Sequence, residues 1–198
     1  MHWSWSIVRS RSSRIRRGIA RLAAAALLTA SLGACAEGRE LVGRVVWVAD
    51  GDSFELADDR GDRWEVRIAG IDAPEKGQPF ADRSRRDLIR LIRDREVRVD
   101  WYKVDRFDRY VGKVWVRSPD APCRADDCPK TLDVGMTQLT IGLAWYFYRF
   151  ADEIAIEDRA RYADAEHEAR ARRSGLWRDA APLPPWEWRE QRRASGGR

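Results

Sequence analysis

The chain has 198 residues, of which 44% are hydrophobic and 35% are charged, enough for one packed domain with an appendage. The formal net charge of +5 is misleading, because residues 1–34 hold six of the 37 basic residues and no acidic ones. Residues 35–198 contain 31 basic and 32 acidic residues, a net charge of −1. Affinity for a polyanion would therefore have to come from local arginines. The two histidines, His2 and His167, are too few for a Cys/His zinc site and nearly exclude histidine-activated nucleophiles.

The first 34 residues predict a secretory signal peptide. An arginine-rich start precedes the apolar run 22–32, which is too short to span a membrane as a mature helix. Residues 32–35 (LGAC) resemble a bacterial lipoprotein box, in which Cys35 would carry the lipid and begin the mature chain. Alternatively, Ala34-Cys35-Ala36 is a site for cleavage before Glu37. We favour lipidation, which predicts a membrane-anchored lipoprotein at the periplasmic face; the other cleavage predicts a secreted protein.

The remaining cysteines, Cys123 and Cys128, lie five residues apart between two prolines. This spacing predicts a small disulfide loop, since an exported protein matures in an oxidising compartment. A metal site at these cysteines would need partners that the sequence does not offer.

The elements expected after a short tether (35–41) are mixed α and β. Hydrophobic alternation and turn residues predict five strands, at 41–48, 53–57, 63–68, 97–102 and 110–116. Helices are predicted at 79–95, 132–141 and 156–173, the last one ended by Gly175. We place the domain at 42–178. The tail 179–198 contains a proline-aromatic segment, 182–188, which we expect to be extended and to pack along the barrel surface, with partner binding as the alternative.

Two acidic turns stand out along the strands. Asp50-Gly51-Asp52-Ser53 follows the first strand, and Asp72 and Glu75 follow the third, which also carries Arg67. Asp50 is expected to form the turn itself. Carboxylates from two such turns can share a hard cation such as Ca²⁺, and a nearby arginine can bind a phosphate through two hydrogen bonds. This combination suits phosphodiester hydrolysis.

These residues also resemble a known family, the staphylococcal (thermonuclease-type) nucleases. The family blocks D-G-D-[TS], R-x(4)-D-x-P-E and D-[RK]-[YF]-G-R correspond here to residues 50–53, 67–75 and 105–109, in the same order. Any single block is weak evidence, but three in order are strong. The resemblance implies an α+β fold: a five-stranded OB-type β-barrel with about three helices.

The resemblance also implies the roles of the acidic residues. Asp52, Asp72 and the backbone carbonyl of Ala73 would bind Ca²⁺, and Glu75 would position or deprotonate the attacking water. These residues could instead have only structural roles: the aspartates would form turns, and Glu75 would be a carboxylate in the first turn of a helix.

Arg67 and Arg109 would bind the phosphate and stabilise the charge of the transition state. Arg67 could instead form a surface ion pair with a strand neighbour. Arg109 departs from the family pattern, because Asp108 stands where the family has glycine. A shifted alignment would bring Arg106 or Lys113 into this role.

Bases stack on aromatic rings in OB-type grooves, and the aromatic run 145–148 lies where the family carries base-contacting tyrosines. We predict Tyr146 and Tyr148 as the substrate contacts. About half of this run should belong to the core instead, because alternate residues of an extended segment face inward.

We therefore predict a monomeric, exported, Ca²⁺-dependent nuclease that cuts DNA or RNA and leaves 3′-phosphate ends, as the family does. The alternative is a non-catalytic OB-type module that binds nucleic acid or protein. The retained combination of arginines and carboxylates argues against this alternative. A third hypothesis is a structural lipoprotein whose Ca²⁺ site only stabilises the fold.

Overall fold

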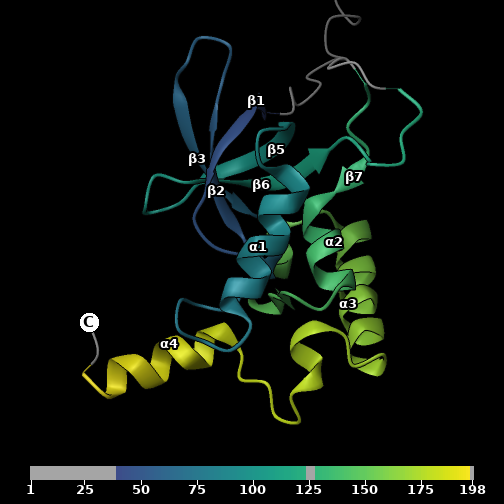
Figure 1. The fold of residues 1–198 in the computed structure, drawn as a ribbon. Coiled ribbons are helices and arrows are strands. Elements are labelled where there is room, and N and C mark those ends of the chain that lie inside the picture. Colours follow the sequence, from purple (N-terminus) through teal and green to yellow (C-terminus); the bar gives the residue numbers. More distant parts are fainter. Residues whose placement is uncertain (1–38, 124–127, 197–198) are drawn as a thin grey trace, which may run out of the picture. The chain divides into compact units, whose positions relative to one another are not determined.

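A computed structural model describes residues 39–123 and 128–196 (Figure 1). The predicted signal peptide, Cys35 and most of the tether lie outside the described residues, so they remain predictions. Within the described ranges, no helix is long and apolar enough to cross a membrane.

The centre of the fold is a closed five-stranded barrel, as predicted. Its strands are β1 (Arg39–Val48), β2 (Ser53–Ala57), β3 (Arg63–Ile68), β5 (Glu96–Val104) and β6 (Tyr110–Val116). Strand β1 pairs antiparallel with β2 and β5, β2 with β3, and β5 with β6. The parallel pairing of β3 with β6 closes the barrel.

Three short strands were not predicted, because two residues carry no readable alternation. Strand β7 (Leu132–Asp133) extends the sheet beside β6. Strands β4 (Ile71–Asp72) and β8 (Trp145–Tyr146) form a separate antiparallel pair. Asp72 therefore lies in a short strand rather than in an irregular segment, and its backbone is held against Trp145.

The third strand shows how the alternation builds the barrel. Val66 and Ile68 are fully buried, whereas Glu65 on the opposite face is exposed. Buried valines from β1, β5 and β6 join them in the same core. Arg67 alternates away from this core, so the barrel wall presents its guanidinium outward.

Helices cover one side of the barrel (Figure 1). They are α1 (Ala81–Ile92), α2 (Val134–Thr140) and α3 (Ile156–Ala171), with 3₁₀ turns η1 (Tyr148–Glu153) and η2 (Gly175–Arg178). Helix α1 contacts β1 and α2, and α2 contacts β6 and α3. The three expected helices are shorter than predicted, and two of them begin two residues later. The first begins after Phe80, whose φ of 69° is not helical, and the second begins after Asp133, whose side chain caps it.

The prediction of an extended tail is wrong from Pro185 onward, because residues Pro185–Ala194 form helix α4. Pro185 occupies the first helical position, where a missing N–H costs nothing and the fixed φ favours the helix. Trp186 does not lie on the barrel surface as expected. It is buried and stacks on Phe147 at 5.4 Å.

The predicted disulfide is confirmed: Cys123 and Cys128 are bonded. The residues between them, 124–127, lie outside the described part of the chain.

Candidate active site

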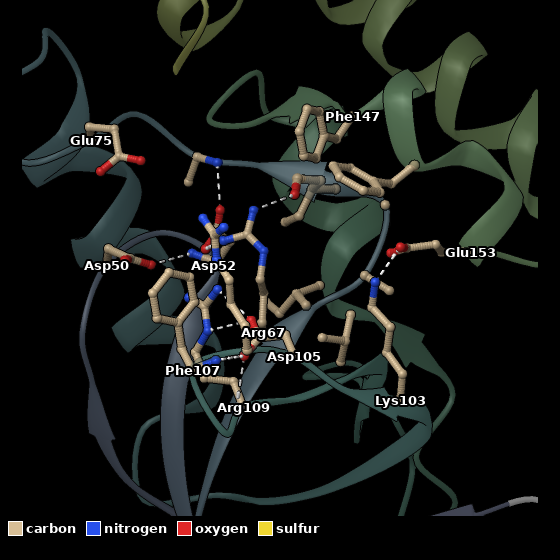
Figure 2. Close-up of a pocket in the computed structure, with 18 of the residues that line it drawn as sticks. Asp50, Asp52, Arg67, Glu75, Lys103, Asp105, Phe107, Arg109, Phe147 and Glu153 are labelled. Carbon is tan, nitrogen blue, oxygen red and sulfur yellow. Dashed lines mark hydrogen bonds and ion pairs between the residues drawn. The ribbon is translucent and has the colours of Figure 1, made fainter. Parts of the chain in front are cut away.

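A cavity of about 760 Å³ opens where β3 ends (Figure 2). Its wall is built from the β1–β2 turn, the segment after β3, the β5–β6 connection, the region around η1, and α4. Three predicted site regions, far apart in sequence, therefore meet in one place. The charged residues that line it are Asp50, Asp52, Arg67, Glu75, Lys103, Asp105, Arg106, Arg109, Glu153, Arg189 and Arg193.

Asp52 is almost fully buried at the β1–β2 turn. Its Oδ1 accepts hydrogen bonds from Arg67 Nη1 at 2.8 Å and Ser53 Oγ at 2.8 Å, and its Oδ2 accepts one from the Ala73 amide at 2.7 Å. The turn that holds it needs Gly51, since a Cβ there would lie 1.9 Å from Ser84 Oγ on α1. Asp50 Oδ1 accepts a hydrogen bond from the Asp52 amide at 3.0 Å, as expected of the residue that forms the turn.

Asp72 lies beside Asp52, and Arg67 joins the two. Arg67 Nη2 donates to Asp72 Oδ1 at 3.2 Å while Nη1 donates to Asp52. Burial and the charge of Asp52 raise the pKa of Asp72 above its ordinary value. Burial alone would lower the pKa of Arg67, but the charges of Asp52 and Asp72 raise it overall. The two carboxylates are thus close enough to repel each other and to attract a cation.

The donor set fits a hard cation such as Ca²⁺. Asp52 and Asp72 offer carboxylate oxygens, and the hydrogen bond from the Ala73 amide holds the backbone at Ala73 near Asp52. In the part of the chain that the structure describes, no three His, Cys, Asp or Glu side chains gather as a ligand cluster. A cation here would therefore depend on the Ala73 carbonyl, water and substrate for its remaining ligands.

Burial, with the charge of Asp52 adding to it, raises the pKa of Asp50 to about 7. Ionising Asp50 as well as Asp52 is therefore disfavoured, first because the turn is buried and second because the two carboxylates repel each other. A cation would relieve the repulsion, so the electrostatics of the turn also favour cation binding.

Glu75 lies at the cavity edge with 39% of its side chain exposed. Its backbone amide donates to Gln78 Oε1 at 2.9 Å, which fixes the peptide but leaves the carboxylate directed toward the cavity. Its carboxylate accepts a hydrogen bond from Arg189 Nη1 at 2.5 Å. Arg189 therefore links Glu75 to Asp72, and through Arg67 to Asp52.

Arg109 also reaches the cavity, and Asp105 holds it there. Its Nε and Nη2 donate to Asp105 Oδ2 at 2.9 and 2.7 Å, and its Nη1 lies 3.4 Å from Ser53 Oγ (Figure 2). Asp108 adopts φ of 61°, the left-handed conformation for which the family uses glycine and which aspartate tolerates. The departure from the family pattern therefore leaves the turn intact.

Of the alternatives to Arg109, only Arg106 lines the cavity. Lys113 lies outside it and is bound by Asp158 at 2.5 Å and Asp133 at 3.3 Å. These ion pairs connect β6 to the N-cap of α2 and to α3, so Lys113 has a structural role.

The predicted tyrosines do not line this cavity. Tyr146 is half-buried and packs edge-on against Tyr162, while Tyr148 is 58% exposed beside Trp186. Their role as base contacts remains a prediction. The aromatic side chains that do line the cavity are Phe107, Phe147 and Phe150.

Sequence reasoning missed Arg189 and Arg193, because the tail was expected to be extended. Had the helix been recognised from Pro185, their four-residue spacing would have placed both arginines on one face. Lys103 and Glu153, which pair at one side of the cavity in Figure 2, belong to no motif recognised in the sequence.

The cavity of this OB-type barrel brings carboxylates and arginines together, and these are the groups with which a phosphodiesterase acts on a phosphodiester. The model of the family described as staphylococcal nuclease homologue matches residues 65–179. The chain is 38% identical over 176 residues to the Escherichia coli protein named ParB, covering 89% of this chain and 94% of that one. It is 36% identical to a Shigella flexneri micrococcal nuclease, covering 85% and 90% of the two chains. It is 31% identical to an Escherichia coli O157:H7 protein named uncharacterized endonuclease, covering 77% and 88%.

The chain therefore belongs to the staphylococcal nuclease family. It is an enzyme of the endonuclease class, a phosphodiesterase.

Proposed function

We propose that this protein is an exported, Ca²⁺-dependent nuclease that hydrolyses DNA and RNA and leaves 3′-phosphate ends. The observation that carries the proposal is the hydrogen-bonded set Asp52–Arg67–Asp72, in which Asp52 and Arg67 line the same cavity as Glu75 and Arg109 while Asp72 is buried behind Arg67. A pure binding module needs no such set of buried carboxylates, because they repel a polyanion unless a cation joins them.

In this proposal Asp52, Asp72 and the Ala73 carbonyl hold the cation. When bound, the cation supplies positive charge to the phosphate and makes a nearby water more acidic. Glu75 accepts the proton of the attacking water at its carboxylate, which the cavity leaves partly exposed.

The arginines stabilise the phosphate. Arg67 and Arg109 have 19% and 22% of their side chains exposed, so both present a partly desolvated guanidinium to the cavity. Such donors stabilise the charge that builds on the phosphoryl oxygens in the transition state. Asp105 orients Arg109 through two hydrogen bonds and thereby limits the entropy that Arg109 loses on binding phosphate.

The proposal of export rests on the arginine-rich, apolar N-terminus and the disulfide. Lipidation of Cys35 would anchor the protein at the periplasmic face, and cleavage before Glu37 would release it. Mass spectrometry of the mature N-terminus distinguishes a diacylglycerol-modified Cys35 from a free Glu37.

The activity is tested with labelled single-stranded DNA and RNA in Ca²⁺ and in excess chelator. We expect cleavage of both polymers in Ca²⁺, none in chelator, and fragments whose 3′ ends need a phosphatase before a polymerase can extend them. Equal cleavage in chelator would refute the role of the cation, and directly extendable 3′ ends would refute the proposed direction of attack.

A further inference from the structure

Helix α4 is fixed against the rim of the active site by its first turn. Trp186 stacks on Phe147 and meets Trp145 edge-on at 5.7 Å, inside a small aromatic core. Just before the helix, the Leu183 carbonyl accepts a hydrogen bond from Gln78, three residues beyond Glu75 in the chain. The next turn of the helix is therefore directed at the cavity.

That turn places Arg189 on the carboxylates of the site. Its Nη2 lies 2.7 Å from Asp72 Oδ2, and its Nη1 lies 3.2 Å from Asp72 Oδ1 and 2.5 Å from Glu75 Oε1. One guanidinium thus bridges the aspartate assigned to the cation and the glutamate assigned to the water. The Asp72 side chain is 1% exposed, so its oxygens have little access to solvent.

We infer that Arg189 is a tethered competitor of the divalent cation: it binds the carboxylates of the site and must leave Asp72 when the cation binds. The inference rests on the cation assignment of the proposed function. Both oxygens of Asp72 already accept arginine donors, Oδ1 from Arg67 and Arg189 and Oδ2 from Arg189. A cation bound to either oxygen would lie next to an arginine donor, and the two positive charges would repel each other at that distance.

Of the two arginines that donate to Asp72, Arg189 is the one that the cation displaces. Arg67 lies on a barrel strand and is held by Asp52 and the Ile71 carbonyl as well as by Asp72. Arg189 lies on a helix whose packing is concentrated at Trp186, and 30% of its side chain is exposed. Its release costs the contacts to Asp72 and Glu75 but leaves the aromatic anchor in place. The consequence is that α4 raises the Ca²⁺ concentration at which the site fills.

The test is calorimetric titration of Ca²⁺ into the wild-type protein, Arg189→Gln and Arg192→Gln without nucleic acid. Arg192 is an exposed arginine on the same helix and does not line the cavity, so its variant matches the charge change. We expect Arg189→Gln to bind Ca²⁺ at least tenfold more tightly than wild type, about 1.4 kcal/mol. Arg192→Gln should stay within about twofold, because solvent and salt screen an exposed charge.

Arg189→Lys is the second variant, because it keeps the charge but cannot form the bidentate pair. Its affinity should lie between those of wild type and Arg189→Gln, which keeps the test decisive if the glutamine variant does not fold. Ca²⁺ affinity of Arg189→Gln equal to or weaker than wild type would overturn the inference and leave the cation assignment standing. Absence of Ca²⁺ binding in both folded proteins would overturn the cation assignment, and the inference with it.

Discussion

Arg67→Gln is the substitution that separates the two tasks of this residue, balancing the carboxylates and stabilising the phosphate. In the structure the guanidinium bonds Asp52, Asp72 and the Ile71 carbonyl, with 19% of the side chain exposed. Without it, Asp52 has no cationic partner in the described contacts, whereas Asp72 keeps Arg189.

The size of the effect follows from these partners. Breaking a buried ion pair from one side costs about 3–5 kcal/mol. The hydrogen bonds from Ser53 and the Ala73 amide remain to satisfy Asp52, so we expect a loss of about 2–3 kcal/mol in chelator. In Ca²⁺ the loss should shrink, because the cation replaces the missing charge. Turnover should still fall by about 10²–10³ in saturating Ca²⁺, because the phosphate donor is gone.

Urea unfolding of wild type, Arg67→Gln and Arg63→Gln, each in chelator and in Ca²⁺, measures the stability change. Arg63 is the matched control, because it lies on the same strand and pairs with Glu55 at the exposed surface. Its variant should lose less than about 1 kcal/mol in both conditions. The reasoning is refuted if Arg67→Gln is no less stable than Arg63→Gln in chelator, or if Ca²⁺ restores its turnover along with its stability.

Three further substitutions test the surroundings of the site. Asp108→Gly should lower the KM for DNA a few-fold, because an acid beside Arg109 opposes the phosphate; an unchanged KM in steady-state assays would contradict this. Trp186→Ala should destabilise the protein by about 3 kcal/mol in thermal unfolding, since it removes a buried indole from an aromatic core; a change below 1 kcal/mol would show that α4 is not anchored there. Partial burial alone would raise the pKa of Asp105, but hydrogen bonds from Arg109 and two backbone amides lower it below its ordinary value. Its contribution to stability is therefore complete above the ordinary value of 3.8 and is lost as the pH falls below it. Asp105→Asn should accordingly have a lower free energy of unfolding than wild type at pH 7, and the difference should shrink in acid. An equal difference at pH 7 and in acid would refute the stabilising role of the ionised Asp105 carboxylate.

The sequence predicted the five strands because they are long enough to show alternation, and the family resemblance then implied that they form a barrel. Val66 and Ile68 on one face and Arg67 on the other already separate the core from the site. The turn 50–53 and the segment after β3 were readable for a related reason, since glycine and proline mark where the strands end. The antiparallel pairing of β2 with β3 sets Ser53 opposite Arg67, and this brings Asp52 close to the segment that follows β3.

What the sequence did not reveal depends on packing between distant segments. Strand β8 exists because Trp145 and Tyr146 meet β4, and two residues give no periodic signal. The tail was misread because three prolines in residues 182–185 suggested an extended chain, whereas the last of them begins α4. Arg189 was missed in consequence, since its contact with Asp72 spans 117 residues.

The most direct test of the account compares DNA hydrolysis by wild type, Glu75→Gln and Glu65→Gln in saturating Ca²⁺, with Ca²⁺ binding measured on the same samples. Glu65 is an exposed glutamate on β3, so its variant controls for the loss of one carboxylate. We predict that Glu75→Gln still binds Ca²⁺ but loses about 10²-fold or more in kcat, while Glu65→Gln retains wild-type turnover. Wild-type turnover in a folded, Ca²⁺-loaded Glu75→Gln would contradict the central claim that this carboxylate activates the water.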